Sequence, residues 1–167
     1  MSAYGRKVLM AAVLVVGGCS EATTVSEPAP GAKRLRARLG ETLTLSGHDG
    51  VAVAVSVGAV ADPATGSPPP NRGHRYVAIR IRAENVGGAM YRDTPSNGAY
   101  LVDDAGHQHG ADIADSVLPA LGSPRIRPGS VETGFITFEV PEDVVPVRFL
   151  LTLNDGFGPD TGEWALF

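Results

Sequence analysis

"RYVAIRIRAEN", residues 75–85, decides the fold of this chain. Alternate side chains of a β-strand point to opposite faces of a sheet, so this period of two predicts a half-buried strand. The face expected to point inward comprises Val77, Ile79, Ile81 and Ala83. The face expected to point outward carries Tyr76, Ala78, Arg80, Arg82 and Glu84.

The same period recurs along the chain from Leu35 onward. In "GVAVAVSVGAV", residues 50–60, every second residue from Val51 to Val57 is valine, and "VETGFITFEV", residues 131–140, alternates in the same way. "VRFLLTL", residues 147–153, is apolar on both faces, which predicts a central strand. Shorter strands are expected at residues 41–46, 99–102 and 163–167.

Turn-forming residues separate these segments and define the fold class. Chain reversals are expected at residues 104–106, 127–129, 140–143 and 154–156, where Gly, Pro, Asn and Asp gather. "DPATGSPPPNRG", residues 62–73, is expected to form an exposed loop rather than a strand. About seven short strands with this spacing predict an all-β fold, an immunoglobulin-like antiparallel β-sandwich of two sheets. We expect the sandwich domain to span residues 35–167.

The N-terminus has the layout of a secretory signal peptide. Arg6 and Lys7 precede an apolar run at residues 8–16, and Gly17-Gly18 supplies small residues before a cysteine. The apolar run would rise only about 14 Å as a helix, against a hydrocarbon core of roughly 30 Å, so a permanent membrane-spanning helix is not expected. Residues 1–18 are therefore predicted to be a signal that is removed.

Cys19 stands where a bacterial lipoprotein carries its lipid. The stretch "LVVGGC" resembles a lipobox, in which the thiol receives a diacylglycerol and becomes the first residue after cleavage. Two acyl chains give stable membrane anchoring where one chain does not. Residues 19–34 are then the lipidated cysteine and a polar tether, which reaches about 40 Å when fully extended and lets the domain stand clear of the membrane. The alternative is an ordinary signal peptide with an incidental cysteine.

Composition narrows the classes of partner. The chain has 14 basic and 18 acidic side chains, a formal net charge of −4, and loss of Arg6 and Lys7 with the signal makes it more acidic. An acidic exported domain is a poor candidate for binding nucleic acid or for electrostatic docking on anionic lipid. Because Cys19 is the sole cysteine, no disulfide can support the fold.

The order of parts resembles the telokin-like, immunoglobulin-like domains of bacterial secreted proteins and lipoproteins, many of which have no known function. The resemblance runs from about residue 41 to the end of the chain. It rests on the strand ending "IRAENVGG", on the "AYLVDDAGHQH" hairpin, on "RPGSVETGFITFEVP" and on the closing "GEWALF". The resemblance implies a β-sandwich and brings no catalytic residues, and the pair Arg125 and Arg127 departs from the pattern.

These observations predict a non-enzymatic binding module without cofactor, held by its lipid on the extracytoplasmic face of the cell membrane. Its partner, an envelope protein or a small ligand, is not identified by the sequence. Sandwich domains place function on loops and edges, so two segments are candidates: residues 62–75 and residues 87–97. The candidate contacts are Pro68, Pro69, Pro70, His74, Arg75, Tyr91 and Arg92.

Two other classes of function stay open. His107 and His109 share a face if they lie on one strand, and with His74 or Asp112 they would give a copper or zinc site; the alternative is an exposed hairpin in water. Oxygen-bearing residues at 154–163 suggest calcium, but ordinary surface turns use the same residues. A hydrolase with an unconventional site is the third class, although no Gly-x-Ser-x-Gly motif supports it.

Overall fold

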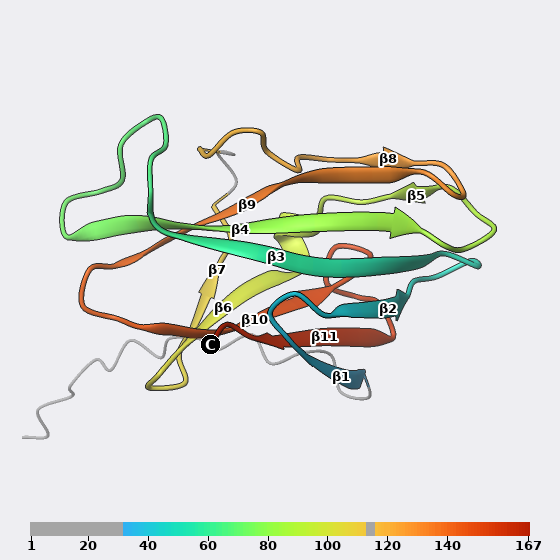
Figure 1. The fold of residues 1–167 in the computed structure, drawn as a ribbon, viewed down its shortest axis with the longest axis horizontal. Coiled ribbons are helices and arrows are strands. Elements are labelled where there is room, and N and C mark those ends of the chain that lie inside the picture. The colour runs from blue at the N-terminus through green and yellow to red at the C-terminus, as the bar shows by residue number, and fades with distance from the viewer. Residues whose placement is uncertain (1–31, 113–115) are drawn as a thin grey trace, which may run out of the picture.

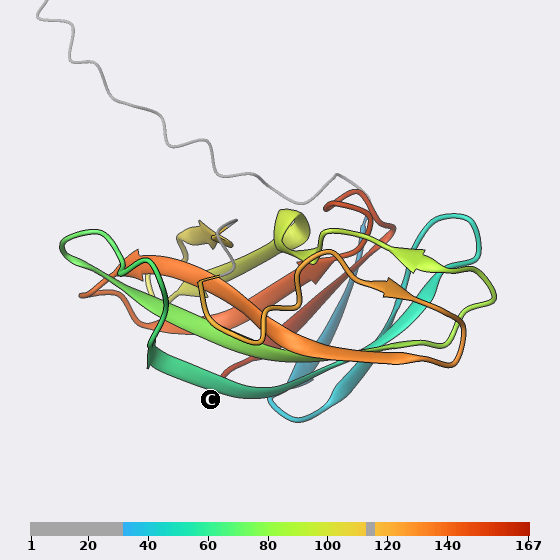
Figure 2. The same cartoon turned by 90° about the horizontal axis from the view of Figure 1, so that it is seen from above.

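The computed structural model describes residues 32–112 and 116–167. The predicted signal, Cys19 and most of the tether lie outside the described residues. Two main sheets stack on each other, and a short two-stranded ribbon lies beside them (Figures 1 and 2). The fold is therefore the expected all-β sandwich. Within the described residues, no helix is long and apolar enough to cross a membrane.

The four-stranded sheet is antiparallel and contains the segment that decides the fold. Its strands, in spatial order, are β2 (Thr42–Ser46), β3 (Ala52–Ala64), β4 (His74–Asn85) and β9 (Val131–Pro141). The strands β3 and β4 form a long hairpin, with register shifts at Val57/Ala59 and at Ala61/Ala64. The strand β4 thus lies inside the sheet, between β3 and β9; its alternating pattern predicts a half-buried strand but not this position.

The five-stranded sheet faces it and contains one parallel pair. Its strands, in spatial order, are β1 (Lys33–Arg38), β11 (Asp160–Ala165), β10 (Pro146–Thr152), β6 (Ala99–Asp103) and β7 (Gln108–Gly110). The strand β10 is central, as expected from its apolar faces. The pair β1–β11 runs parallel, whereas the sequence predicts antiparallel pairs only. Alternation shows which face a strand buries but does not identify its partner, and these strands come from opposite ends of the chain.

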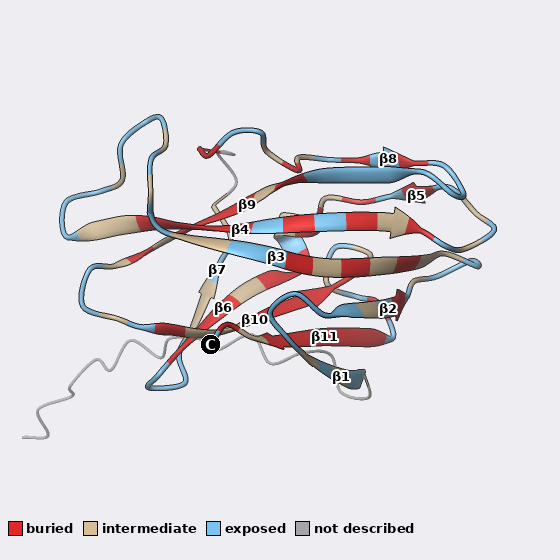
Figure 3. Ribbon diagram, in the orientation of Figure 1, coloured by how far each residue is buried: buried red, intermediate tan, exposed pale blue. Residues whose placement is uncertain are grey.

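The core lies between the two sheets and follows the predicted inward faces. Val77, Ile79 and Ile81 of β4 are fully buried, and the strands show alternating bands of burial (Figure 3). Phe149 lies between Phe138 and Trp164, at ring-centroid distances of 6.1 and 5.7 Å. The Trp164 indole donates a hydrogen bond to a backbone carbonyl before β2. Trp164 is therefore a core residue.

The outward face of β4 is not wholly exposed, although strict alternation predicts that every residue on that face meets solvent. Tyr76 and Ala78 are buried together with Val117, in a second small apolar cluster. The chain around Val117 follows the edge of β9, where isolated bridges join Ala111 to Phe138 and Ala120 to Phe135. Coverage by a segment remote in sequence cannot be deduced from a local period of two.

Two boundaries differ from the sequence-based expectation. The strand β1 begins at Lys33, inside the predicted tether, because Leu35 and Ala37 pack against the core. The strand β3 continues to Ala64, so the predicted proline-rich loop begins three residues later than expected. Smaller elements complete the fold: β5 (Tyr91–Arg92), the 3-10 helix η1 (Pro95–Gly98) and β8 (Arg125–Ile126).

Candidate functional site

Asn85, at the end of β4, fixes the two-stranded ribbon on the sandwich. Its side chain is fully buried, and its Nδ2 donates to the carbonyls of Ala89 and Ile126, at 2.8 Å each. Its Oδ1 accepts the backbone N–H of Gly87 at 3.0 Å. One amide therefore joins the chain entering β5 to the strand β8, and the pairing of β5 with β8 places Tyr91 opposite Ile126.

Asp93 joins the same ribbon to the loop between β10 and β11. Its Oδ2 accepts the Tyr91 hydroxyl at 3.0 Å and the backbone N–H of Asn154 at 2.7 Å. Its Oδ1 accepts the N–H groups of Thr94 at 2.8 Å and of Asp155 at 2.9 Å. Four donors thus occupy this buried carboxylate. Burial, together with the nearby Asp93 charge, raises the pKa of Tyr91 well above its ordinary value, so this phenol stays protonated.

A cavity of about 230 Å³ opens beside this carboxylate. Arg92 of β5 and Arg125 of β8 are Cα partners across the ribbon, and both are exposed. The Arg92 Nε donates to the sulfur of Met90 at 3.2 Å. No ion pair joins either guanidinium to a carboxylate among the described residues. The remaining lining residues are Asp93, Thr94, Ser123, Pro124 and Asp155.

The two guanidinium groups of the cavity, whose lining also contains the carboxylates of Asp93 and Asp155, favour a ligand that carries an anionic group. Like charges directly opposite each other on paired strands destabilise the pair, and an anion between Arg92 and Arg125 would relieve this repulsion. Guanidinium groups bind carboxylate or phosphate through paired N–H donors. Asp93 has little capacity left to accept a hydrogen bond from a ligand, because four donors already surround it. The Oδ1 of Asp155 accepts the Asn97 amide at 2.8 Å, and within the described part of the chain its other oxygen is left for a donor on the ligand.

The other predicted segment, residues 62–75, is built differently. Arg75 donates to both carboxylate oxygens of Asp62, at 2.6 and 2.9 Å, and to the carbonyls of Pro141 and Val144. The hydrogen bond and the charge of Asp62 outweigh burial and raise the pKa of Arg75. The guanidinium thus joins β3 and β4 to the turn after β9. Its paired N–H donors are used in these contacts and do not point to an external partner.

The other candidates of that segment lie near its surface. Pro68 and Pro69 are exposed and Pro70 is half-buried. The His74 Nδ1 lies 3.4 Å from the carbonyl oxygen of Arg72. Of the two predicted segments, the one with Tyr91 and Arg92 has a cavity whose guanidinium groups lack a carboxylate partner among the described residues, although Tyr91 is itself buried.

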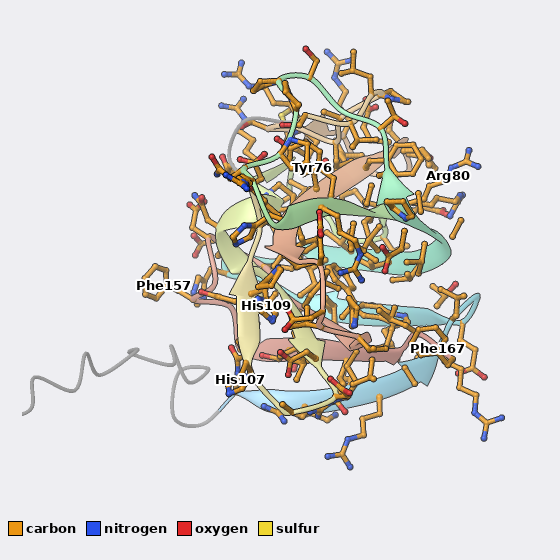
Figure 4. All side chains as sticks on the ribbon, turned by 90° about the vertical axis from the view of Figure 1, so that its left-hand side faces the viewer. Tyr76, Arg80, His107, His109, Phe157 and Phe167 are labelled. Carbon is orange, nitrogen blue, oxygen red and sulfur yellow. The ribbon has the colours of Figure 1, made fainter. Side chains whose placement is uncertain are left out.

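The predicted histidine pair lies on the hairpin of β6 and β7 (Figure 4). The His109 Nε2 lies 2.9 Å and the His107 Nδ1 3.3 Å from the Oδ2 of Asp103, a buried carboxylate that the sequence argument did not select. The backbone N–H of His107 donates to the other oxygen at 2.8 Å. Burial by itself raises the pKa of Asp103, but these hydrogen bonds and the imidazole charges outweigh it and hold the pKa below its ordinary value.

The two residues proposed to complete a metal site do not join this pair. His74 lies at the start of β4, and Asp112 accepts a hydrogen bond from Ser116. In the described part of the chain, no group of three or more His, Cys, Asp or Glu side chains is arranged to hold a metal ion. The cluster of Asp103, His107 and His109 instead closes the hairpin turn.

A second depression, of about 250 Å³, lies on the open face of the four-stranded sheet. It is lined by Ser56, Gly58, Ala59, Arg80, Arg82 and Thr133. Its Arg82 is already paired with Glu84 at 2.9 Å. Counted over the described residues, the cavity at the ribbon therefore has more charged side chains without an ion-pair partner, and it is the better candidate site.

Sequence reasoning selected Arg92 but missed its companions. Asp93 and Thr94 precede a proline and look like ordinary turn residues. In the sequence, Arg125 stands out only as a departure from the family pattern. The one signal of this pairing in the sequence is that each of the two short segments, 91–92 and 125–126, has an arginine beside a largely apolar residue. These segments pair through two β-strands that have only two residues each, and such pairings leave no periodic pattern.

Comparison with solved structures identifies the same fold in bacterial proteins. The secreted protein MPT63 of Mycobacterium tuberculosis has a TM-score of 0.63 at 17% identity, over 80% of this chain and 98% of that one. The yjhA protein of Bacillus subtilis has a TM-score of 0.54 at 16% identity, over 78% and 98%. A candidate lipoprotein of Bacillus subtilis, ycdA, has a TM-score of 0.52 at 14% identity, over 75% of this chain and 39% of that one. These similarities confirm the β-sandwich.

Comparison of sequences gives the family. No curated protein sequence matches the chain. The model of a domain of unknown function, DUF4352, matches residues 44–161, which include β3 to β10 and both ends of the ribbon. The expected resemblance to a bacterial sandwich domain of unknown function is thereby confirmed. This chain belongs to the DUF4352 family.

Proposed function

We propose that this chain is a non-enzymatic binding module that holds a ligand through an anionic group at the ribbon of β5 and β8. The observation that carries the proposal is the pair Arg92 and Arg125, opposite each other at a cavity and without a carboxylate partner among the described residues. A carboxylate or a phosphate is the ligand chemistry that such a pair recognises.

The rigidity of the surroundings supports binding at this place. Asn85 fixes both strands of the ribbon through buried hydrogen bonds, and Asp93 fixes the neighbouring loop. A site held by buried hydrogen bonds loses little conformational freedom when a ligand arrives, which favours affinity.

The absence of enzymatic activity is part of the proposal. The titratable groups of the two candidate clusters are engaged within the fold: four donors surround Asp93, and the imidazoles of His107 and His109 contact Asp103. A screen of ester and glycan substrates should give no turnover. Turnover that survives purification and is lost with a site variant would contradict this part.

The site can be tested with small anions on the chain from residue 19 onward, with Cys19→Ser so that no lipid is attached. Inorganic phosphate and N-acetylglycine serve as phosphate and carboxylate probes in an NMR titration. We expect amide shifts at Arg92, Thr94 and Arg125 with at least one probe. Paired Arg92→Gln and Arg125→Gln substitutions should abolish the shifts, and the exposed Arg127→Gln should not. Equal shifts in all three proteins would refute the site.

We further propose that Cys19 carries a lipid that holds the module on the extracytoplasmic face of the cell membrane. The secreted and lipoprotein descriptions of MPT63 and ycdA support an extracytoplasmic location, and the lipobox-like "LVVGGC" supports the anchor. Cys19→Ala should prevent incorporation of labelled fatty acid and release the protein from membranes or leave it unprocessed. Normal labelling of that variant would exclude Cys19 as the acceptor.

A further inference from the structure

The edge strand β1 concentrates positive charge next to the predicted tether. Its sequence is KRLRAR, in which Leu35 and Ala37 pack inward and the basic residues are exposed. The basic residues of β1 are Lys33, Arg34, Arg36 and Arg38. This strand thus holds four of the chain's 14 basic side chains within six residues. Figure 3 shows β1 exposed along the border of the sandwich, beside the buried β11.

Glu163 of β11 gathers three arginines on the side of this sheet that points away from the core. Arg34 and Arg36 approach it at 3.4 and 3.5 Å, and Arg148 of β10 at 3.6 Å. The Glu163 side chain is only 10% exposed, whereas that of Arg36 is 73% exposed. The carboxylate lies beneath the guanidinium groups, so the surface that solvent meets is cationic.

Sheet register adds one more arginine to this surface. Arg38 of β1 and Arg148 of β10 both pair with Ala165 of β11, so the three residues form one row across the sheet. Residues in one row share a face. We call Arg34, Arg36, Arg38 and Arg148 the arginine face. Among the described residues, Glu163 is the one carboxylate ion-paired with these four positive charges, and the Glu41 carboxylate accepts the backbone N–H of Arg38 at 2.7 Å beside them; the whole chain is nevertheless acidic.

We propose that the arginine face docks on anionic phospholipid headgroups of the membrane that carries the anchor. This inference rests on the proposed anchor at Cys19. The chain enters the fold at Lys33, at one end of the face, and the segment from Cys19 reaches at most about 40 Å. The strand β1 is therefore the described strand nearest to Cys19 in the sequence, and a tether of this reach is long enough to let it meet the bilayer. Guanidinium groups pair with headgroup phosphates as they do with other phosphates.

Docking in this way orients the module. Figure 1 shows β1 and β11 along the lower border and β5, β8 and β9 along the upper one. With the arginine face on the bilayer, the ribbon that carries Arg92 and Arg125 is directed away from the membrane. The proposed ligand cavity is then open to the envelope space.

The docking can be measured without the anchor, on the chain from residue 19 onward with Cys19→Ser. This form contains all the described residues. We expect co-sedimentation with vesicles of phosphatidylglycerol and phosphatidylcholine at low ionic strength, and none with phosphatidylcholine alone. Arg36→Gln with Arg38→Gln should lower the partition coefficient about 25-fold, roughly fivefold for each arginine lost near an anionic surface. Salt at 0.5 M should release the protein.

Matched variants distinguish the face from charge in general. Arg72→Gln with Arg127→Gln makes the same change in net charge at exposed positions elsewhere and should bind as the parent does. Arg36→Lys with Arg38→Lys keeps the charge and should also bind. An equal loss in the Arg72 and Arg127 variant, or binding to neutral vesicles, would overturn the proposal, as would the absence of binding to anionic vesicles.

The outcome is independent of the other proposals. Loss of lipid labelling in Cys19→Ala tests the anchor alone, because the vesicle assay uses protein that has no lipid. Arg92→Gln with Arg125→Gln should leave vesicle binding unchanged. If that variant abolished binding instead, the ribbon would be the membrane contact and the arginine face would not.

Discussion

Replacement of Asn85 by alanine should destabilise the protein more than its small change in volume suggests. The substitution removes three hydrogen bonds: two from Nδ2, at 2.8 Å each, and one to Oδ1 at 3.0 Å. The carbonyl of Ile126 lies in a buried environment and loses its donor. A hydrogen bond contributes about 1 kcal/mol net, and an unsatisfied buried acceptor costs about 1–3 kcal/mol. We expect a loss of about 3 kcal/mol in the free energy of unfolding.

The loss can be read from urea unfolding of the unlipidated chain, followed by far-ultraviolet circular dichroism. For a domain of this size, a loss of about 3 kcal/mol corresponds to a fall in Tm of roughly 10 °C. Asn97→Ala is a suitable control, because it removes one hydrogen bond at an exposed position. The control should change the unfolding free energy by less than about 0.5 kcal/mol.

An isosteric substitution separates hydrogen bonding from packing. Asn85→Asp keeps the shape but places a carboxylate oxygen where Nδ2 meets two carbonyls. We expect at least as large a loss as in Asn85→Ala at neutral pH, because a buried charge would face two acceptors. Burial raises the pKa of such an acid, so stability should partly return as the pH falls and the group is protonated. A loss below about 1 kcal/mol in both variants would refute the role given to Asn85.

Three further predictions test other parts of the fold. Gly87→Ala should cost more than about 2 kcal/mol, since its Cβ would lie 2.5 Å from a backbone nitrogen of β3, whereas Gly88→Ala meets no atom within 4 Å and should be nearly neutral in the same denaturation assay. The lowered pKa of Asp103 stabilises the folded state at pH values above the ordinary aspartate pKa near 4, and this stabilisation is lost as the pH falls through the folded-state pKa. Asp103→Asn should therefore flatten the dependence of the unfolding free energy on pH in that acidic range, and an unchanged dependence would contradict this. Trp164→Phe removes the indole hydrogen bond to Glu41 and part of the core contact, and a loss of about 1–3 kcal/mol is expected; a smaller change than that of an exposed control would argue against a core role.

The sequence predicted the parts of the fold that depend on a single strand. Strand β4 and its inward residues Val77, Ile79 and Ile81 follow from a period of two, and the centre of the second sheet follows from "VRFLLTL". Strand pairing was less accessible. The parallel pair of β1 with β11 and the burial of Tyr76 both arise from segments far apart in the chain, and alternation contains no information about such partners.

The candidate site was predictable only in part, for a related reason. Arg92 was selected because a loop of a sandwich is a usual place for function. Its companion Arg125 and the organising carboxylate Asp93 come together through strands of two residues and through backbone donors of a distant loop. Backbone N–H groups are present at almost every residue, so their convergence on one carboxylate leaves no trace in the sequence.

The net charge of the chain does not predict the charge of each of its surfaces. A formal net charge of −4 argues against docking on anionic lipid. This argument uses a sum over the whole chain and ignores where the charges lie. At physiological salt the Debye length is about 8 Å, so a headgroup beneath β1 interacts with the arginine face and hardly at all with acidic residues on the far side of the sandwich. Sheet register then decides the matter: it places Arg38 and Arg148 in one row and brings three arginines to one carboxylate. An acidic protein can therefore present a cationic face to a membrane, and the remaining acidic surface would favour the orientation in which only that face is in contact.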